Sequence, residues 1–168
     1  IVTYKFASQF NTSSIVRRCK TGGFFLFGQY DSTGGQKNAF ISKFDDNMNV
    51  IWEKFFNYSA DNKFNEVTED IYSNIYAVGN INPTTSEQNA IALKLDSSGN
   101  FLSDMSFGHL LFGSANGTVN ALGICVSNSG DVFCSGSVKD GAFYNALIFK
   151  ICNFNSNCNL SFNSQPIN

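Results

Sequence analysis

The five cysteines are the residues of this 168-residue chain with the most evident covalent chemistry, because paired thiols oxidise to disulfides. Cys125 and Cys134 flank the Ser129-Gly130 turn symmetrically, so they face each other if that turn closes a two-residue hairpin. Cys152 and Cys158 bracket a loop further along. The spacing predicts the disulfides Cys125–Cys134 and Cys152–Cys158 and an oxidising compartment. The alternative is that all five thiols are reduced core residues; Cys19 is left over, either free or bonded to a partner chain.

Asparagine offers a second modification chemistry, the attachment of N-linked glycans at Asn-x-Ser/Thr sequences. Four such sequences begin at Asn11, Asn57, Asn116 and Asn159. The first three follow the last strand of one repeat, as defined below, and precede the first strand of the next. This places them in loops on one rim of the fold, whereas Asn159 enters a strand. We predict glycosylation first of all at Asn57 and Asn116, provided that the chain is secreted.

Two acidic turns have the oxygen spacing of a calcium loop, in which ligands sit at offsets 1, 3, 5 and 9. The residues at these offsets are Asp45, Asn47, Asn49 and Glu53 in one turn, and Asp96, Ser98, Asn100 and Asp104 in the other. The glycine expected after the fifth position is replaced by Val50 and Phe101, and full carboxylates are few. The sequence therefore favours plain Asx turns that join two strands, and predicts no metal site.

Groups for catalysis are scarce. His109 is the single histidine, and no nucleophile motif accompanies it. Gly22-Gly23 and Gly34-Gly35 lack the Lys-Ser/Thr of a phosphate-binding loop. We therefore predict that the chain is not an enzyme and needs no cofactor.

Charge and hydropathy exclude further partners. Eleven Lys plus Arg stand against 13 Asp plus Glu, a net charge of −2, so the basic field that attracts nucleic acid is missing. No apolar run approaches the roughly 20 residues that span a bilayer. The chain begins at Ile1 without an initiator methionine or signal peptide, and we expect a mature or truncated product.

An internal repeat organises the sequence. Three glycines, Gly28, Gly79 and Gly136, each follow an apolar run and precede a lysine by 15, 15 and 14 residues. The lysines are Lys43, Lys94 and Lys150, in the runs Asn38-Ala-Phe-Ile-Ser-Lys-Phe-Asp45, Asn89-Ala-Ile-Ala-Leu-Lys-Leu-Asp96 and Asn145-Ala-Leu-Ile-Phe-Lys-Ile-Cys152. Since the spacing within a copy is nearly constant, the variation in length is confined to loops.

Each copy predicts four short strands, called here A to D. Strand A spans 15–20, 67–72 and 122–127, strand B ends near the glycine, strand C is the Asn-Ala run, and strand D follows. Strand C is apolar on both faces. One face is large (Phe40, Phe44, Ile91, Leu93, Leu95, Leu147, Phe149 and Ile151) and the other is smaller (Ala39, Ile41, Ala90, Ala92, Ala146 and Ile148). A sheet buried on both sides, with the large face of one copy on the small face of the next, indicates an all-β, β-propeller-like fold.

The pattern of an apolar run with glycine, a spacer, and Asn-Ala-apolar-apolar-apolar-Lys-apolar-Asp-Ser-Ser-Gly-Asn resembles the blade repeat of the bacterial-type SBBP β-propellers, and more loosely Kelch-like families. The copy from Phe64 to Phe107 is the best match, and the likeness covers about residues 14–162. The third copy departs from it, with Cys152 in place of the aspartate. The resemblance implies four-stranded antiparallel blades and brings no catalytic residues.

The predicted domain therefore holds an orphan strand at 1–10 and blades at 14–56, 64–107 and 119–162. Three blades do not close a propeller, which usually needs at least four. Either the chain is a piece of a longer propeller, or its unpaired edges pair with another copy. The first functional hypothesis is an extracellular structural or adhesive glycoprotein that assembles with copies of itself into a fibre or surface layer. The alternative is a lectin-like or protein-binding module that uses the loops 31–37, 80–88 and 138–144.

Overall fold

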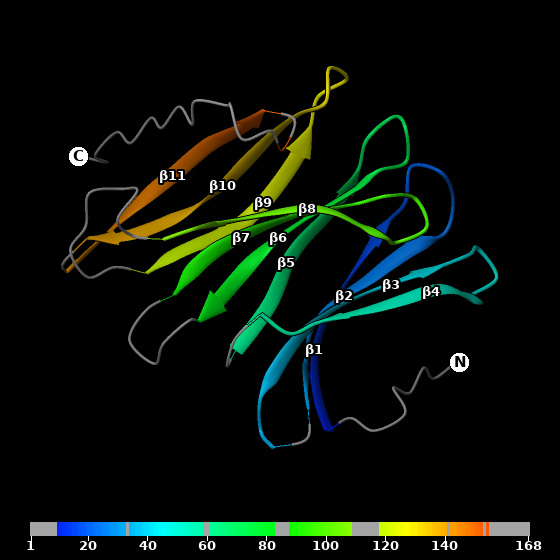
Figure 1. The fold of residues 1–168 in the computed structure, drawn as a ribbon, viewed down its shortest axis with the longest axis horizontal. Coiled ribbons are helices and arrows are strands. Elements are labelled where there is room, and N and C mark those ends of the chain that lie inside the picture. The colour runs from blue at the N-terminus through cyan, green and yellow to red at the C-terminus, as the bar shows by residue number, and fades with distance from the viewer. Residues whose placement is uncertain are drawn as a thin grey trace.

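The computed structural model describes residues 10–32, 34–58, 61–82, 88–108, 118–140, 142–152 and 154. Over these residues the chain forms eleven strands and no helix, which confirms the predicted all-β class (Figure 1). The strands are β1 (Phe10–Arg18), β2 (Phe24–Asp31), β3 (Lys37–Phe44), β4 (Val50–Phe56), β5 (Asp61–Glu69), β6 (Ile75–Asn82), β7 (Asn89–Leu95), β8 (Phe101–Phe107), β9 (Val119–Val126), β10 (Asp131–Asp140) and β11 (Phe143–Cys152). No helix in the described ranges is long and apolar enough to cross a membrane.

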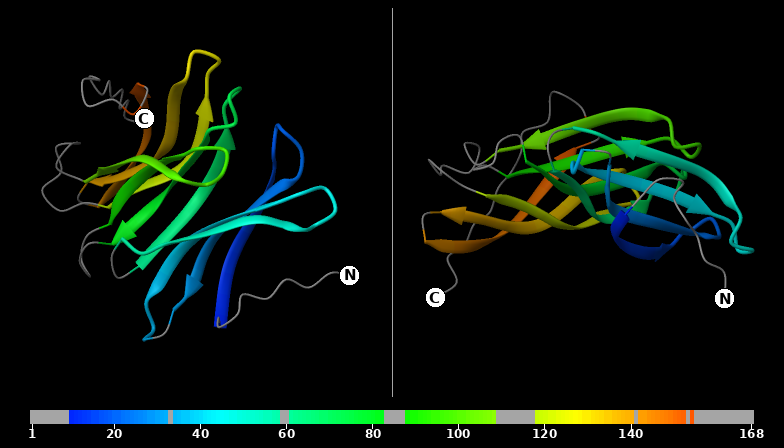
Figure 2. Two further views of the ribbon diagram at one scale, coloured as in Figure 1. Left: turned by 45° about the vertical axis from the view of Figure 1, so that its right-hand side comes forward. Right: turned by 90° about the horizontal axis from the view of Figure 1, so that it is seen from below.

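The strands form three consecutive antiparallel units in which strands adjacent in sequence pair with each other. β1 to β4 make the first unit, β5 to β8 the second and β9 to β11 the third. Single parallel bridges connect the units, Lys37 with Asp61 and Gln88 with Thr118. Figure 2 shows the second unit lying between the other two. The predicted strand at 1–10 lies outside the described residues except for Phe10, which begins β1, and so does the predicted last strand of the third copy.

Two apolar clusters join the units, and both follow the predicted packing of a large face on a small face. In the first cluster Ile91 and Leu93 of β7 pack with Ala39 and Ile41 of β3. In the second, the large face of β11 (Leu147, Phe149 and Ile151) packs with the small face of β7 (Ala90 and Ala92). All of these side chains are at most 2% exposed. The second and third units therefore each bury their large face on the unit before them.

The turns share one five-residue geometry that the sequence only partly reveals. In the turns at 45–49, 70–74 and 96–100 the first aspartate accepts hydrogen bonds at Oδ1 from the third and fifth backbone amides, at 2.8–2.9 Å. Asp45 and Asp96 thus form the predicted Asx turns. The sequence does not predict a turn at Asp70. It places a strand over 67–72, but β5 ends at Glu69 and the turn begins at Asp70.

The fourth residue of each such turn has a positive φ. Among the described residues, glycine fills this position as Gly22, Gly35, Gly99 and Gly130, with φ of 98°, 79°, 77° and 85°. Met48 and Ser73 occupy it in the other two, with φ of 67° and 65°. A side chain in this region costs roughly 1–2 kcal/mol, so these two turns carry local strain.

The turn between β9 and β10 overturns one predicted disulfide. Because this turn runs from Ser127 to Asp131, the register places Cys125 opposite Phe133 and Cys134 opposite Ile124. The two thiols therefore point to opposite faces of the sheet, one exposed and one buried, and both are free. The predicted Cys125–Cys134 disulfide is wrong, because the two-residue hairpin assumed for it does not form.

The repeated glycines mark places where two strands approach closely. A Cβ atom on Gly79 would lie 1.8 Å from the carbonyl oxygen of Lys63, and one on Gly136 would lie 1.8 Å from that of Asn120. Both glycines lie beside an irregularity in register on the neighbouring strand. The close approach explains why the repeat has glycine at these positions.

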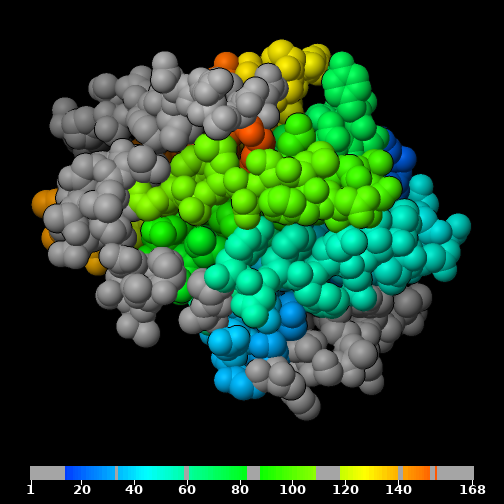
Figure 3. All heavy atoms as spheres, in the orientation of Figure 1, coloured from blue at the N-terminus to red at the C-terminus, as the bar shows by residue number. Residues whose placement is uncertain are grey.

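Trp52 links the first and second units on the outside. Its Nε1 donates a hydrogen bond to the Ser97 carbonyl oxygen at 3.2 Å, and its ring packs on Gly99, where a Cβ atom would lie 2.9 Å from the ring. Figure 3 shows β4 and the β7–β8 hairpin side by side on this face. Trp52 is thus a packing residue.

Candidate functional site

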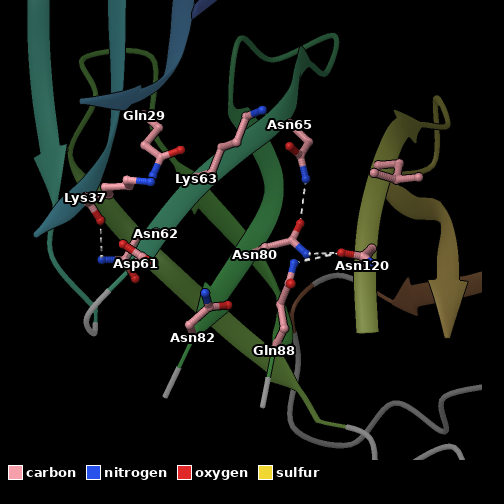
Figure 4. Close-up of a pocket in the computed structure, with 11 residues that line it drawn as sticks. Gln29, Lys37, Asp61, Asn62, Lys63, Asn65, Asn80, Asn82, Gln88 and Asn120 are labelled. Carbon is pink, nitrogen blue, oxygen red and sulfur yellow. Dashed lines mark hydrogen bonds between the residues drawn. The ribbon is translucent and has the colours of Figure 1, made fainter. Parts of the chain in front are cut away.

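A polar cavity lies where inner strands of the three units converge (Figure 4). Its volume is about 370 Å³. Seven carboxamide residues line it (Gln29, Asn62, Asn65, Asn80, Asn82, Gln88 and Asn120), together with Lys37, Asp61, Lys63 and Leu122. We call this cavity the amide pocket. It lies at the base of the loops that the lectin-like hypothesis singled out, because Gln29 and Asn82 lie near the ends of β2 and β6.

A chain of hydrogen bonds orients one wall of the amide pocket. Asn65 Nδ2 donates to Asn80 Oδ1 at 2.5 Å, and Asn80 Nδ2 donates to Asn120 Oδ1 at 2.7 Å. Gln88 Nε2 donates to the same Asn120 oxygen at 2.7 Å, and Asn120 Nδ2 donates to Ser137 Oγ at 3.3 Å. The dashed lines of Figure 4 follow the part of this chain inside the pocket. These contacts hold side chains from β5, β6 and β9 in fixed orientations.

Other polar side chains of the lining have no hydrogen-bond partner in the described part of the protein. Within the described ranges, the side chains of Gln29, Asn82 and Lys63 make no hydrogen bond to the protein. Two lysines and one aspartate give the lining a formal charge of about +1. The amide pocket therefore combines a preorganised wall with free donors and acceptors.

The sequence signal for this pocket was missed. The residue after each repeated glycine is polar (Gln29, Asn80 and Ser137), although its neighbours in the strand are apolar. Asn80 is 7% exposed and lies in the network. Polar residues that recur at one position of otherwise apolar strands indicate that the three units share a polar region there.

The repeated lysines form a second recurrent feature. Each ammonium lies over an aromatic ring of the paired strand: Lys43 over Phe25, Lys94 over Tyr76 and Lys150 over Phe133, at 5.3–5.6 Å from the ring centroid. The register pairs these residues directly. The lysines thus have the structural role that the repeat favours.

Lys43 has an additional partner across the first junction. Its Nζ lies 2.8 Å from Glu69 Oε1, and the two side chains are 9% and 0% exposed. Glu69 also accepts hydrogen bonds from the Lys20 amide at 2.8 Å and from the Thr21 hydroxyl at 3.1 Å. The carboxylate therefore ties together the β1–β2 turn, β3 and β5. At the second junction, Val126 occupies the position that corresponds to Glu69. Glu69 pairs with Ile75 and Val126 pairs with Val132, and Ile75 and Val132 are equivalent residues of the repeat.

The third unit leaves its small face open. Phe133 is 38% exposed and Ile148 is 62% exposed, whereas the corresponding Tyr76 and Ala92 of the second unit are 1% and 0% exposed. A groove of about 400 Å³ runs along this face beside Cys125. At the other end of the molecule, Val16 on the large face of the first unit is 57% exposed, and the corresponding Val67 is 3% exposed. Both end faces thus expose positions that are buried inside.

The other predicted site residues are partly described. Asn57 is exposed just after β4, where a loop was expected. Asn11 lies within β1, so its predicted placement in a loop is wrong. Asn116, Asn159, Cys158 and His109 lie outside the described residues, and Cys152 ends β11. The described part contains no cluster of three His, Cys, Asp or Glu residues that would hold a metal ion.

Burial controls the chemistry of two thiols. Desolvation raises the pKa of Cys19 to about 12, with a contribution from the nearby Glu69. Burial likewise raises the pKa of Cys134 to about 12, with a contribution from Cys125. Both are therefore protonated and unreactive at neutral pH.

No protein-family model matches the chain, and comparison with curated proteins finds no match. The function is therefore argued from the geometry.

Proposed function

We propose that this chain is an arc of three β-propeller blades and acts as an extracellular structural protein that assembles with further copies of itself. The observation that carries the proposal is the contrast between equivalent positions. The small face is buried in the first and second units by the following unit, and it is open in the third.

The repeat supports a second copy as the occupant of the open face. Two junctions of this chain already consist of a large face on a small face, and on the large face of the first unit Val16 is 57% exposed, although Phe40 and Phe44 are buried. A second copy brings that face to Phe133 and Ile148. Isolated exposed apolar residues need no explanation, but these two lie on one face beside a groove, as expected for an interaction surface.

The extracellular location rests on the sequons, with Asn57 exposed at the end of β4. Of the two predicted disulfides, Cys152–Cys158 is the one left that would indicate an oxidising compartment. Mass spectrometry of the secreted chain before and after enzymatic deglycosylation tests the location. We expect a loss of mass that maps to Asn57, and an unmodified Asn57 in chain recovered from the medium would contradict its glycosylation.

The assembly proposal is tested by sedimentation velocity of the full chain over a range of concentrations. We expect the sedimentation coefficient to rise with concentration, and Ile148→Asp to abolish the rise. Ile71→Asp is the matched control, because Ile71 is 58% exposed in the turn at 70–74 of the second unit, away from both end faces. A chain that stays monomeric at the highest concentration overturns the proposal, and loss of assembly only in the control overturns the assignment of the face.

A further inference from the structure

The lining of the amide pocket restricts its ligand to polar molecules. Small-molecule pockets are usually lined mainly by apolar side chains, with a few polar groups. Here carboxamides predominate, and among the described lining residues Leu122, which is 55% exposed, is the single apolar one. The volume of about 370 Å³ falls within the roughly 300–1,000 Å³ of ligand sites. An apolar ligand would gain little burial here and would leave Gln29 and Asn82 without hydrogen-bond partners.

The charges of the lining exclude strongly anionic ligands. Recognition of phosphate relies on clusters of arginine or on backbone amides at a helix start. The described lining has no arginine, and Asp61 offsets one of the two lysines. The ligand that fits is neutral or weakly charged.

Carboxamides select hydroxyl groups among neutral partners. Each Asn or Gln side chain has two donor hydrogens and an acceptor oxygen, and each hydroxyl both donates and accepts. Neighbouring hydroxyls on a sugar ring can therefore bond to adjacent amides. A peptide, by contrast, is usually held by an apolar anchor or an unpaired strand edge. The single exposed leucine makes a poor anchor.

The hydrogen-bond chain prepares the pocket for such a ligand. Asn65, Asn80, Asn120 and Gln88 are already oriented, so binding does not have to order them. Gln29 and Asn82 remain unbonded on the facing wall. From these observations we propose that the amide pocket binds a saccharide through its ring hydroxyls.

The experiment is a titration of the full chain with glucose, galactose, mannose, N-acetylglucosamine and their β-linked disaccharides. Carboxamide ¹H–¹⁵N resonances report the binding, and calorimetry gives the affinity. We expect saturable shifts of the pocket carboxamides for at least one saccharide. Gln29→Ala should weaken that affinity about 2- to 12-fold, the value of one neutral hydrogen bond. Asn47→Ala, at an exposed position in the turn at 45–49 and outside the pocket lining, is the control and should leave it unchanged.

Three results would overturn the proposal. The first is the absence of carboxamide shifts with every saccharide at tens of millimolar. The second is an equal effect of Gln29→Ala and Asn47→Ala on affinity. The third is a response to trialanine and to no saccharide, which would identify a peptide site. Repeating the titration on Ile148→Asp separates the result from assembly, because that residue lies outside the pocket lining.

Discussion

Replacement of Lys43 by methionine should be among the most destabilising single changes at the first junction. Methionine keeps most of the length of the side chain but leaves the Glu69 carboxylate, which is 0% exposed, without its countercharge. Removing one partner of a buried ion pair typically costs about 3–5 kcal/mol. The amides and hydroxyl of the β1–β2 turn remain as donors, so we expect a cost near the lower end of that range.

The repeat supplies a matched control at the second junction. Lys94 lies over Tyr76 as Lys43 lies over Phe25, but Val126 takes the position of Glu69. Lys94→Met therefore loses mainly a cation–π contact, worth roughly 0.5–1 kcal/mol at an exposed site. The two variants should differ by about 2–4 kcal/mol.

Equilibrium unfolding in urea measures this difference. With a slope of about 2 kcal/mol/M, the midpoint of Lys43→Met should fall by roughly 1.5–2.5 M relative to the unaltered chain. Adding Glu69→Gln should restore part of the loss, because the uncompensated charge is then gone. If Lys43→Met and Lys94→Met lie within about 1 kcal/mol of each other, the ion pair does not stabilise the junction and the reasoning fails.

Other changes test the turns, the strand contacts, the pH dependence and the thiols. Met48→Gly should raise the free energy of unfolding by up to about 1 kcal/mol, since φ there is 67°, and a lowered urea midpoint would contradict the strain. Gly79→Ala should lower the thermal midpoint more than Gly34→Ala, because a Cβ atom on Gly79 meets the Lys63 carbonyl, whereas one on Gly34 meets no atom and adds only the strain of a φ of 94°. Burial raises the pKa of Asp70, but hydrogen bonds led by those from Asn74 outweigh it and lower the pKa overall. The ionised Asp70 therefore stabilises the fold above the unfolded pKa of about 3.9, and this stabilisation is lost as the pH falls. Asp70→Asn should flatten the decline in stability below about pH 4, measured by circular dichroism. Ellman's reagent should label Cys125 quickly and Cys134 only after unfolding, and mass spectrometry after mild oxidation should find no Cys125–Cys134 disulfide.

The features that could be predicted from the sequence are those that every unit repeats. The glycine-to-lysine spacing, the aspartate turns before β4 and β8, and the two apolar faces of strand C recur, so local pattern and repetition agree. The turn at 70–74 was hidden because Ile71 and Tyr72 look like strand residues, yet they are 58% and 74% exposed. Hydrophobic periodicity cannot distinguish an apolar residue in a turn from one in a strand.

The features that escaped prediction join residues distant in sequence. Glu69 meets Lys43 only because two units pack together, and no local pattern on β5 marks that carboxylate as a partner. Cys125 and Cys134 lie symmetrically about a two-residue turn in the sequence. The turn that forms shifts the register by one residue, and such a shift moves the side chains of one strand to the opposite face of the sheet. The amide pocket likewise needs β2, β5, β6 and β9 in place before its members become neighbours.

In the proposed assembly, the difference between the two end faces would make the stacking of copies directional. A large face takes a small face, so the contact is heterologous, and a copy with one blocked end still has one competent end. Val16→Asp blocks the large face of the first unit and Ile148→Asp the small face of the third. Each variant alone should sediment as a monomer, whereas an equimolar mixture should form a heterodimer through the two unaltered faces. If the mixture stays monomeric, or if Val16→Asp assembles as the unaltered chain does, stacking of a large face on a small face is not the mode of association.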